Sequence, residues 1–526
     1  MAQIRLFNLF IHCVIFSGGL TYGFGFAGFT TSIGQPSFYK YFKLDRHLHS
    51  ILGAVNALFY AGCAFGSIVQ AYLADWVGRK RALMIAAIAA CIGAALGAGS
   101  VNVPMLVTCR LIHGFGLGMD IPLIPLFLTE LASARHRGFL SGLTTLSFAT
   151  GYVMYAIYSY STWGRLGQEK GTDTIIACSC GWIAVGTYFA TNETFQWRFP
   201  LAIACLPPLI MVATIPFLPE SPRYLAWVGK HDEAWKVISK IHYDPEDVGD
   251  ASAARAEYTQ IVRQVEYDKE SSTSMLQIFK RPTWRRRAFL AMFILFASQS
   301  TGVFGIANYL PIIVGSMGET GVMPLVLYGV YTTTGTLMVL VVISVLDRVG
   351  RRTMFLIGFP GMALCLLAEA VLQWKYLGTT SSGGNAACIL FIFVYIVFYQ
   401  GVDAPSFVWA AEIFPTTIRA KGIALAFFSY FLGAITYTTP APTALRNIGY
   451  RLYFIYMALC IISTVIVYFF VMETKGKPVE ELGALFGDKV VVHLTSDGHG
   501  IVEEKLMAEV KEDKVEEVKI DVTTVI

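Results

Sequence analysis

The sequence predicts an all-α membrane protein of twelve spanning helices in two six-helix halves, and three observations support this prediction. The 526 residues are 55% hydrophobic and 14% charged, whereas soluble domains carry about 25% charged residues. Apolar runs of about twenty residues, each long enough to cross a hydrocarbon layer about 30 Å thick, recur from Asn8 to Phe470. Charged motifs also recur in the same order in two parts of the chain.

Each apolar run is expected to be a helix, because backbone groups in lipid must be hydrogen-bonded within their own segment. The expected spans are 8–30, 51–73, 82–100, 105–128, 139–160, 199–218, 288–314, 322–346, 353–374, 387–411, 422–444 and 452–472. A further apolar stretch, 174–190, is interpreted as an ordered outer loop or re-entrant segment, because an extra span would place later basic loops outside. Asn192 beside it begins a glycosylation sequon whose occupancy stays open.

Basic residues fall on alternate connections between the spans, as at Arg79-Lys80-Arg81 and at Arg351-Arg352. By the positive-inside rule, these loops and both termini are expected in the cytoplasm. The cell membrane is the default location, since no organelle address is readable.

The charge pattern also divides the chain into four parts. Residues 1–220 and 288–475 are expected to form the N-terminal and C-terminal six-helix halves, and the charged segment 221–287 a cytoplasmic linker with short helices. Residues 476–526 mix both charges without an apolar core, so this tail is expected to be largely disordered.

Three charged motifs occur at matching places in the two halves. Their residues are Asp75, Arg79, Glu130, Arg137, Glu220 and Arg223 in the first half, and Asp347, Arg351, Glu412, Arg419 and Glu473 in the second. Acids and arginines at helix ends can pair through charge-assisted hydrogen bonds. These pairs are expected to hold the two halves together on the cytoplasmic side, and to break during an alternating-access cycle around a midplane site.

These motifs resemble the sugar porter family of the major facilitator superfamily, from about Gly19 to Leu482. The stretch from Gly34 to Asp45 resembles a branch common in filamentous fungi. The strongest marks are Arg110 to Glu130, Pro219 to Arg223, Asp347 to Arg352, and Glu412 to Pro415. The resemblance implies the major facilitator fold and transport of a sugar or polyol held between the halves.

The resemblance also suggests which residues contact the solute. Seventh-span amides of sugar porters bind sugar hydroxyls, and here Gln299 survives in place while Asn308 lies nearby. The family's fifth-span glutamine falls on Thr145, and its tenth-span tryptophan falls on Phe407. The expected substrate-binding residues are Gln299, Asn308, Tyr309, Thr145, Ser298, Phe407 and Asp403.

Proton coupling is expected at a different acid from that of the family. Proton-linked sugar porters carry a first-span acid that engages a fourth-span arginine, and here Arg110 remains but Tyr22 to Gly25 contains no acid. Asp120, Glu369 and Asp403 lie within predicted spans, where charged groups are costly and usually face a cavity. Asp120 is therefore the expected proton carrier, with Arg110 in the coupling site. A structural role is the alternative, and it is favoured for Glu369.

Other classes of protein have less support. The sequence shows no converging nucleophile and base, no phosphate-binding Gly-x-x-x-x-Gly-Lys loop, no basic stripe for nucleic acid and no metal-ligand spacing among its ten cysteines. An enzyme, a cofactor and a nucleic-acid partner are therefore not expected. An organic acid or phosphate porter using Arg110, a facilitative uniporter and a non-transporting sugar receptor remain open alternatives.

Overall fold

The computed structural model describes most of the chain, and nearly all of the described part is helical. The described residues are 6–43, 48–131, 146–148, 150, 181–241, 252–270, 274–318, 321–377, 379, 381–415, 418–475, 492–494 and 501–503.

The first half and the linker contain long membrane helices followed by short ones. The first half has α1 (Leu6–Ile33), α2 (Pro36–Phe42), α3 (Leu48–Val77), α4 (Arg79–Ala98), α5 (Val103–Leu131), α7 (Gly181–Tyr188), α8 (Glu193–Ile203), α9 (Leu206–Thr214) and the 3-10 turn η2 (Ile215–Phe217). The linker has α10 (Pro222–Val228), α11 (His231–Ile241), α12 (Ser252–Glu270) and α13 (Met275–Lys280).

The second half has a similar series of helices, and a short hairpin follows it. Its helices are α14 (Pro282–Ser300), α15 (Val303–Ala307), α16 (Leu310–Ser316), α17 (Met323–Val349), α18 (Arg351–Tyr376), α19 (Ser382–Glu412), α20 (Arg419–Thr438), α21 (Ala441–Asn447) and α22 (Arg451–Phe470). In the tail, β1 (Val492–Leu494) pairs antiparallel with β2 (Ile501–Glu503), and Val492 lies opposite Glu503.

Within the described residues, eleven helical segments are long and apolar enough to cross a membrane. The fifth expected span, 139–160, lies largely outside the described residues. The prediction of an all-α membrane protein is confirmed. The described part of the stretch 174–190 begins at residue 181 and contains the eight-residue helix α7, which packs on α1, α8 and α17 and is by itself too short to cross a bilayer.

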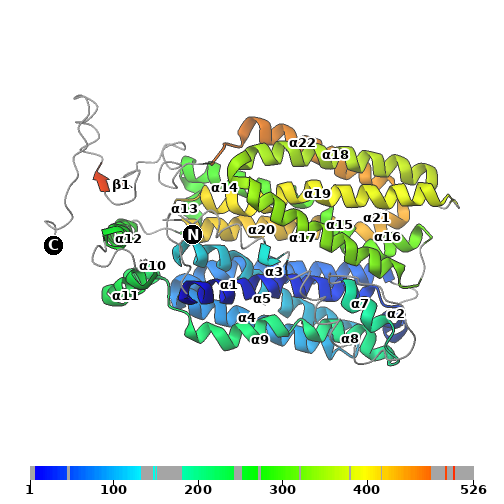
Figure 1. The fold of residues 1–526 in the computed structure, drawn as a ribbon, viewed down its shortest axis with the longest axis horizontal. Helices are drawn as coiled ribbons and strands as arrows, with labels where there is room; N and C mark the ends of the chain where they lie inside the picture. The colour runs from blue at the N-terminus through cyan, green and yellow to red at the C-terminus, as the bar shows by residue number, and fades with distance from the viewer. Residues whose placement is uncertain are drawn as a thin grey trace.

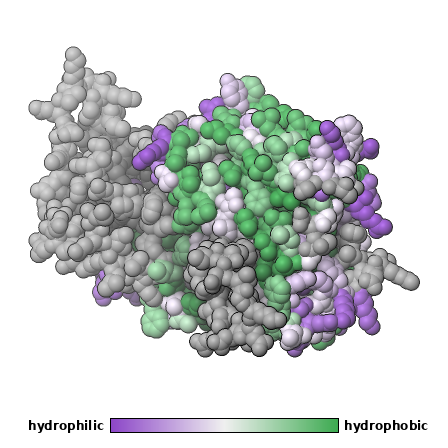
Figure 2. All heavy atoms as spheres, turned by 45° about the vertical axis from the view of Figure 1, so that its right-hand side comes forward, coloured by the Kyte–Doolittle hydropathy of each residue, from purple (hydrophilic) through white to green (hydrophobic). Residues whose placement is uncertain are grey.

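The two halves lie side by side, with the linker helices at one end of the bundle (Figure 1). We call this the linker end, and we call the opposite end, where α2, α7 and α16 lie, the far end. Figure 2 shows hydrophobic side chains across the middle of the visible face, with hydrophilic residues gathered towards its ends. This distribution is what a bilayer belt requires, because charged side chains in hydrocarbon are costly.

Three alternate glycines of α5, Gly114, Gly116 and Gly118, which we call the glycine run, let α5 lie in direct contact with two neighbouring helices. A Cβ atom added at Gly114 would lie 2.0 Å from the carbonyl oxygen of Phe59, and one at Gly118 would lie 2.0 Å from that of Cys63, both on α3. A Cβ atom at Gly116 would instead lie 2.3 Å from the backbone nitrogen of Ala90, on α4. The glycine run therefore lets three backbones touch, as is common where membrane helices pack closely.

The two halves meet mainly along α3 and α20, with further contacts from α5 to α20 and from α7 to α17. In the second half, α14 ends at Ser300 and the chain continues as α15 after a bend at Gly302. Gly302 has a φ of 84°, in the left-handed region that L-residues with a Cβ avoid. A Cβ atom there would also lie 2.3 Å from the ring of Tyr456.

We therefore expect Gly302→Ala to lower the free energy of unfolding by about 1–3 kcal/mol, the usual cost of a strained backbone position. Gly315→Ala is the matched control, since Gly315 lies in α16 with open space around its Cβ position. The apparent melting temperature of the purified protein would measure both. Equal melting temperatures for the two variants would contradict the strain at Gly302.

Candidate functional site

A cavity lies between the two halves, and half of the residues that line it are aromatic. They include Phe26, Phe148, Phe304, Tyr331, Phe407 and Tyr430. The polar lining residues include Thr332, Thr336, Gln400 and Asp403, and Asp403 is the one acid in the described lining. A mostly apolar cavity with a few placed polar groups is typical of a small-molecule site.

Ring contacts cross the cavity from one half to the other. The centroids of Phe26 and Phe304 are 5.0 Å apart, and those of Phe148 and Phe407 are 5.9 Å apart in an edge-to-face arrangement. Phe407, which takes the place of the sugar porters' tryptophan, also stacks on Phe427 at 5.2 Å. Aromatic pairs at these separations are attractive beyond their buried area, so both halves contribute to the apolar wall.

A short hydrogen-bonded chain leads from the cavity wall into the second half. The hydroxyl of Tyr399 donates to Oδ1 of Asp403 at 2.8 Å, and Nε2 of Gln299 lies 3.4 Å from that hydroxyl and donates to it. Gln299 also donates to Oγ of Ser298 at 3.2 Å. Asp403 and Tyr399 line the cavity, whereas Gln299 and Ser298 lie buried behind it.

Asn308 and Tyr309 lie towards the far end, where they bind the opposite half. Nδ2 of Asn308 donates to the hydroxyl of Tyr60 at 3.1 Å, and Oδ1 of Asn308 accepts from the hydroxyl of Thr30 at 3.1 Å. Nδ2 of Asn56 donates to the hydroxyl of Tyr309 at 2.8 Å. These three hydrogen bonds join α1 and α3 of the first half to the segment between α15 and α16 of the second half.

Arg110 is buried in the first half without a carboxylate among its described contacts. Its guanidinium lies between the rings of Phe29 and Phe59, 4.4 Å and 4.1 Å from their centroids. It donates to the carbonyl oxygen of Gly25 at 3.2 Å and lies 3.5 Å from Nδ1 of His113. Two aromatic faces and a backbone carbonyl therefore stabilise this buried cation, at the turn where proton-linked porters carry their acid.

Asp120 lies on α5 and is 1% exposed. Neither carboxylate oxygen has a hydrogen-bond partner among the described residues. A Cβ atom added at Gly18 would lie 3.2 Å from Oδ1, so α1 passes directly beside the acid. Asp120 does not belong to the described cavity lining, and Arg110 does not contact it.

Glu369 is buried inside the second half, away from the cavity lining. Nε2 of Gln373 donates to its Oε1 at 2.7 Å and to the hydroxyl of Tyr453 at 3.1 Å. These contacts join α18 to α22. Thr145 and Arg137 lie outside the described residues.

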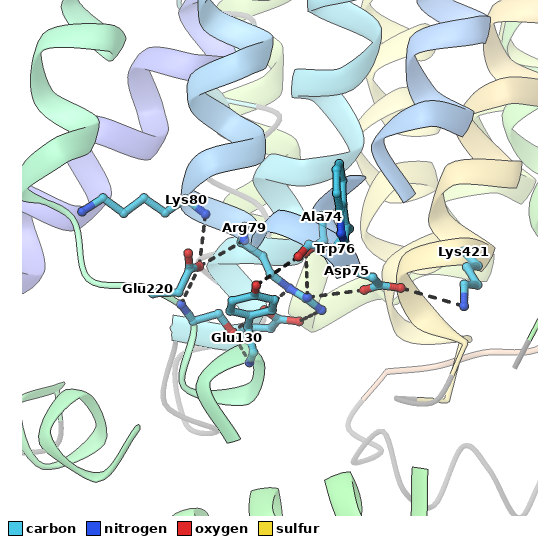
Figure 3. Close-up of polar contacts among 10 residues, drawn as sticks. Ala74, Asp75, Trp76, Arg79, Lys80, Glu130, Glu220 and Lys421 are labelled. Atoms are coloured by element: carbon cyan, nitrogen blue, oxygen red, sulfur yellow. Dashed lines mark hydrogen bonds and ion pairs between the residues drawn. The ribbon is translucent and has the colours of Figure 1, made fainter. Parts of the chain in front are cut away.

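At the linker end of the first half, Arg79 lies at the centre of a charged network (Figure 3). Its guanidinium binds Glu130 through two hydrogen bonds of 3.0 and 3.1 Å, and lies 3.3 Å from Asp75. The hydroxyl of Ser221 donates to Glu130 at 2.5 Å. Burial would raise the pKa of Glu130, but Arg79, Arg223 and Ser221 outweigh it, and the pKa lies below its usual value.

Glu220 holds the start of α4 in the same network. The backbone amides of Arg79 and Lys80 both donate to Oε1 of Glu220 at 3.1 Å. A carboxylate suits this position, because a helix N-terminus carries free amides and a partial positive charge. Gly78 permits this approach: its φ is 97°, and a Cβ atom there would lie 2.6 Å from Oε2 of Glu220.

The second half repeats this arrangement. Arg351 binds Glu412 and Asp347, each at 2.9 Å. The amides of Arg351 and Arg352 donate to Glu473 at 2.9 and 3.1 Å, next to Gly350 with a φ of 97°. The hydroxyl of Thr474 donates to Glu412 at 2.6 Å, as that of Ser221 does to Glu130. Both networks therefore join three separate segments of one half.

The expectation that the repeated charged pairs bridge the halves is wrong for the pairs that the structure describes. The partners of Arg79 and Arg351 all belong to their own halves. Among the described ion pairs, one crosses between halves: Nζ of Lys421 on α20 lies 3.8 Å from Asp75 on α3 (Figure 3). The motifs pair locally because each acid comes from a helix end adjacent to its arginine.

Several residues of the site are not among those expected from the sequence. Ser221 and Thr474 each follow a motif glutamate directly, and this shared position is a signal that could have identified them. Tyr399 lies four residues before Asp403, which places both on one face of a helix. Thr332 and Thr336 show the same spacing on α17, but nothing in the sequence distinguishes their face from the lipid-facing one.

A helical bundle of two repeated halves around a central cavity, with matching charged networks, defines a transporter of the major facilitator type. Residues 11–486 match the family described as sugar (and other) transporter, and the chain belongs to this family. It is a multi-pass membrane transporter and not an enzyme.

Relatives match over nearly their whole length. The MFS-type transporter criB of Aspergillus cristatus is 30% identical, over 92% of this chain and 95% of that protein. The MFS glucose transporter mfs1 of Aspergillus flavus is 26% identical, over 92% and 90%. The proton:xylose symporter XylE, solved with 6-bromo-6-deoxy-D-glucose, superposes with a TM-score of 0.73 at 22% identity, covering 91% and 99%. This structural likeness shows the fold.

Replacing Glu130 with glutamine is expected to lower the free energy of unfolding by about 3 kcal/mol, because it leaves the buried guanidinium of Arg79 without its main partner. Thermal unfolding of the purified protein would measure the loss. Glu233→Gln is the matched control, since the exposed Lys230–Glu233 pair is worth at most about 1 kcal/mol. A similar loss in both variants would contradict a special role of the buried pair.

The stability of the wild-type protein should also depend on pH through Glu130. A carboxyl whose pKa is lowered by folding stabilises the protein when ionised, and this contribution is lost as pH falls below the unfolded-state pKa, about 4.5. As pH is lowered from about 4.5, the melting temperature of wild type should therefore fall more steeply than that of Glu130→Gln. Parallel pH profiles would contradict the ionised pair.

Proposed function

We propose that this protein carries a sugar or polyol across a membrane by alternating access, coupled to proton movement. The observation that carries the proposal is a central cavity between two repeated halves, together with hydrogen bonds towards the far end that cross from one half to the other. The proposal is also supported by relatives named as sugar or glucose transporters and by a structural neighbour that is a proton:xylose symporter.

The far-end contacts are suited to reversible opening. Three hydrogen bonds to Asn308 and Tyr309 close this side, and each contributes about 1 kcal/mol net because water replaces the lost partner on opening. The bend at Gly302 separates α14 from α15 directly beside them. The segment that carries Asn308 can therefore part from α1 and α3 at a cost that solute binding can supply.

The cavity offers complementary chemistry to a sugar ring. Aromatic faces such as Phe304 and Phe407 suit the apolar C–H face of a ring, while Asp403 and Thr336 offer acceptors or donors to its hydroxyls. Gln299 would affect solute binding indirectly, through its hydrogen bond to Tyr399. Asn308 would affect it through closure of the far end. Few amides face the cavity among the described residues, so a solute with fewer hydroxyls than a hexose would fit as well.

We propose Asp120 as a proton carrier, since a buried carboxylate without a described hydrogen-bond partner is stable when protonated. Arg110, held by Phe29 and Phe59, lies ten residues earlier on the same helix, about 15 Å away, and is the second residue that we propose for proton coupling. By the positive-inside rule, the linker end would face the cytoplasm. We also propose that both termini are cytoplasmic and that the protein lies in the cell membrane.

Uptake of labelled sugars and polyols in cells lacking their own carriers tests this function. We expect uptake of at least one of them, and a large reduction by an uncoupler. Organic acids and phosphate belong in the panel, because uptake of an anion alone would favour that alternative. Uncoupler-resistant uptake would indicate a uniporter, and a solute that binds without any flux would indicate a receptor.

Asp120→Asn should reduce proton-driven accumulation of the transported solute about tenfold, the factor that one coupled proton contributes at a pH difference of one unit. Glu369→Gln is the matched control, because Glu369 is similarly buried but accepts a hydrogen bond from Gln373, whereas Asp120 has no described partner. Undiminished accumulation by Asp120→Asn, at wild-type surface expression, would contradict the role of this acid.

A further inference from the structure

The internal repeat extends into the membrane. Asp120-Ile121-Pro122 lies on α5, and Asp403-Ala404-Pro405 lies on α19. The first acid precedes Glu130 by ten residues and the second precedes Glu412 by nine. With a rise of 1.5 Å per residue, both carboxylates lie about 14–15 Å from the helix-end acid that binds the motif arginine of their half. The two acids therefore occupy matching depths in matching helices.

The surroundings of the two acids differ. Asp120 is buried inside the first half, whereas Asp403 lines the cavity and is partly exposed. One oxygen of Asp403 accepts the hydroxyl of Tyr399 at 2.8 Å. The other has no described hydrogen-bond partner within the protein, so it is available to a proton or to a solute in the cavity.

No permanent cation among the described residues holds Asp403 in its ionised form. The titratable groups of the described lining are Tyr22 on α1, Tyr328 and Tyr331 on α17, Tyr399 on α19 and Tyr430 on α20. The packed helix α14 brings the amide of Gln299, and α18 brings Glu369 and Cys365, which lie away from the lining. Neutralising the carboxylate of Asp403 while the halves reorient around the cavity therefore requires a proton or a cationic solute group.

We infer that Asp403 is a second proton site of the transport cycle, loaded from water in the cavity and linked to solute binding. The inference rests on the proposed function. A proton from water on one side adds to the carboxylate and forms the neutral acid. After the halves reorient, the same proton leaves to water on the other side, and no other bond is made or broken.

Tyr399 gives this site a physical link to the solute and to the bend in the second half. The acid form of Asp403 can donate to a solute oxygen, whereas the carboxylate can only accept. Tyr399 connects Asp403 to Gln299, three residues before Gly302. Protonation and solute binding at Asp403 would therefore both be transmitted to α14 beside the far-end closure.

The test is a thermodynamic one, in proteoliposomes containing the full-length protein. At zero membrane potential and a pH difference of one unit, each coupled proton multiplies the limiting solute accumulation by ten. We expect about 100-fold accumulation for wild type, and about tenfold for Asp403→Asn and for Asp120→Asn. The ratio of protons to solute, followed with a pH-sensitive dye, should fall from two to one in each variant.

Glu369→Gln serves as the control for loss of a buried acid and should keep the wild-type ratio. A ratio that is unchanged in Asp403→Asn, or a wild-type ratio of one that only Asp120→Asn abolishes, would overturn the inference. If Asp403→Asn cannot be purified folded, Asp403→Glu replaces it. Its pH midpoint for solute binding, measured by tryptophan fluorescence, should shift from that of wild type, and an unshifted midpoint would overturn the inference.

The same assays separate this inference from the proposed function. If the wild-type protein shows no counterflow of any sugar or polyol, the proposed function is contradicted. The second proton site is then overturned as well, because it rests on that function. Counterflow and uphill accumulation in wild type, with an unchanged proton ratio in Asp403→Asn, overturn the second proton site alone.

Discussion

The carboxylates of Glu220 and Glu473 each accept hydrogen bonds from the first free amides of a membrane helix. The arrangement of the helices within each half depends on this contact. The helices α4 and α18 begin immediately after a glycine with a φ of 97°, so their first turns would otherwise present unsatisfied donors near the membrane surface. The carboxylate satisfies two of these donors at once. It also fixes the end of the sixth or twelfth span against the start of the third or ninth.

The arginine at each helix start is positioned by the same contact. Because the backbone of Arg79 is held by Glu220, its guanidinium reaches Glu130 and Asp75, and Arg351 reaches Glu412 and Asp347 in the same way. A buried guanidinium is costly unless charged partners surround it. The network thus explains why acids, glycine and arginine recur together, and why they recur in both halves.

The helical bundle, its spans and its repeat could be predicted from the sequence, because a hydrophobic run of fixed length has few alternatives in a bilayer. Whether the charged motifs pair within or between halves could not, since residue type alone allows both. The same limit applies to Gln299: its place in the seventh span is readable, but its orientation towards Tyr399 instead of the cavity depends on side-chain packing. The role of Asn308 in closing the far end depends on Tyr60 and Thr30, more than 240 residues away in sequence.

The glycine run in α5 has a mechanical consequence. Where backbones touch without side chains between them, there is no layer of rotatable groups that could absorb a displacement of one helix against the next. The helices α3, α4 and α5 are therefore constrained to turn together as one lever. In the proposed alternating-access cycle, these three helices would move as one body, and a rotation that closes one end of the cavity would open the other.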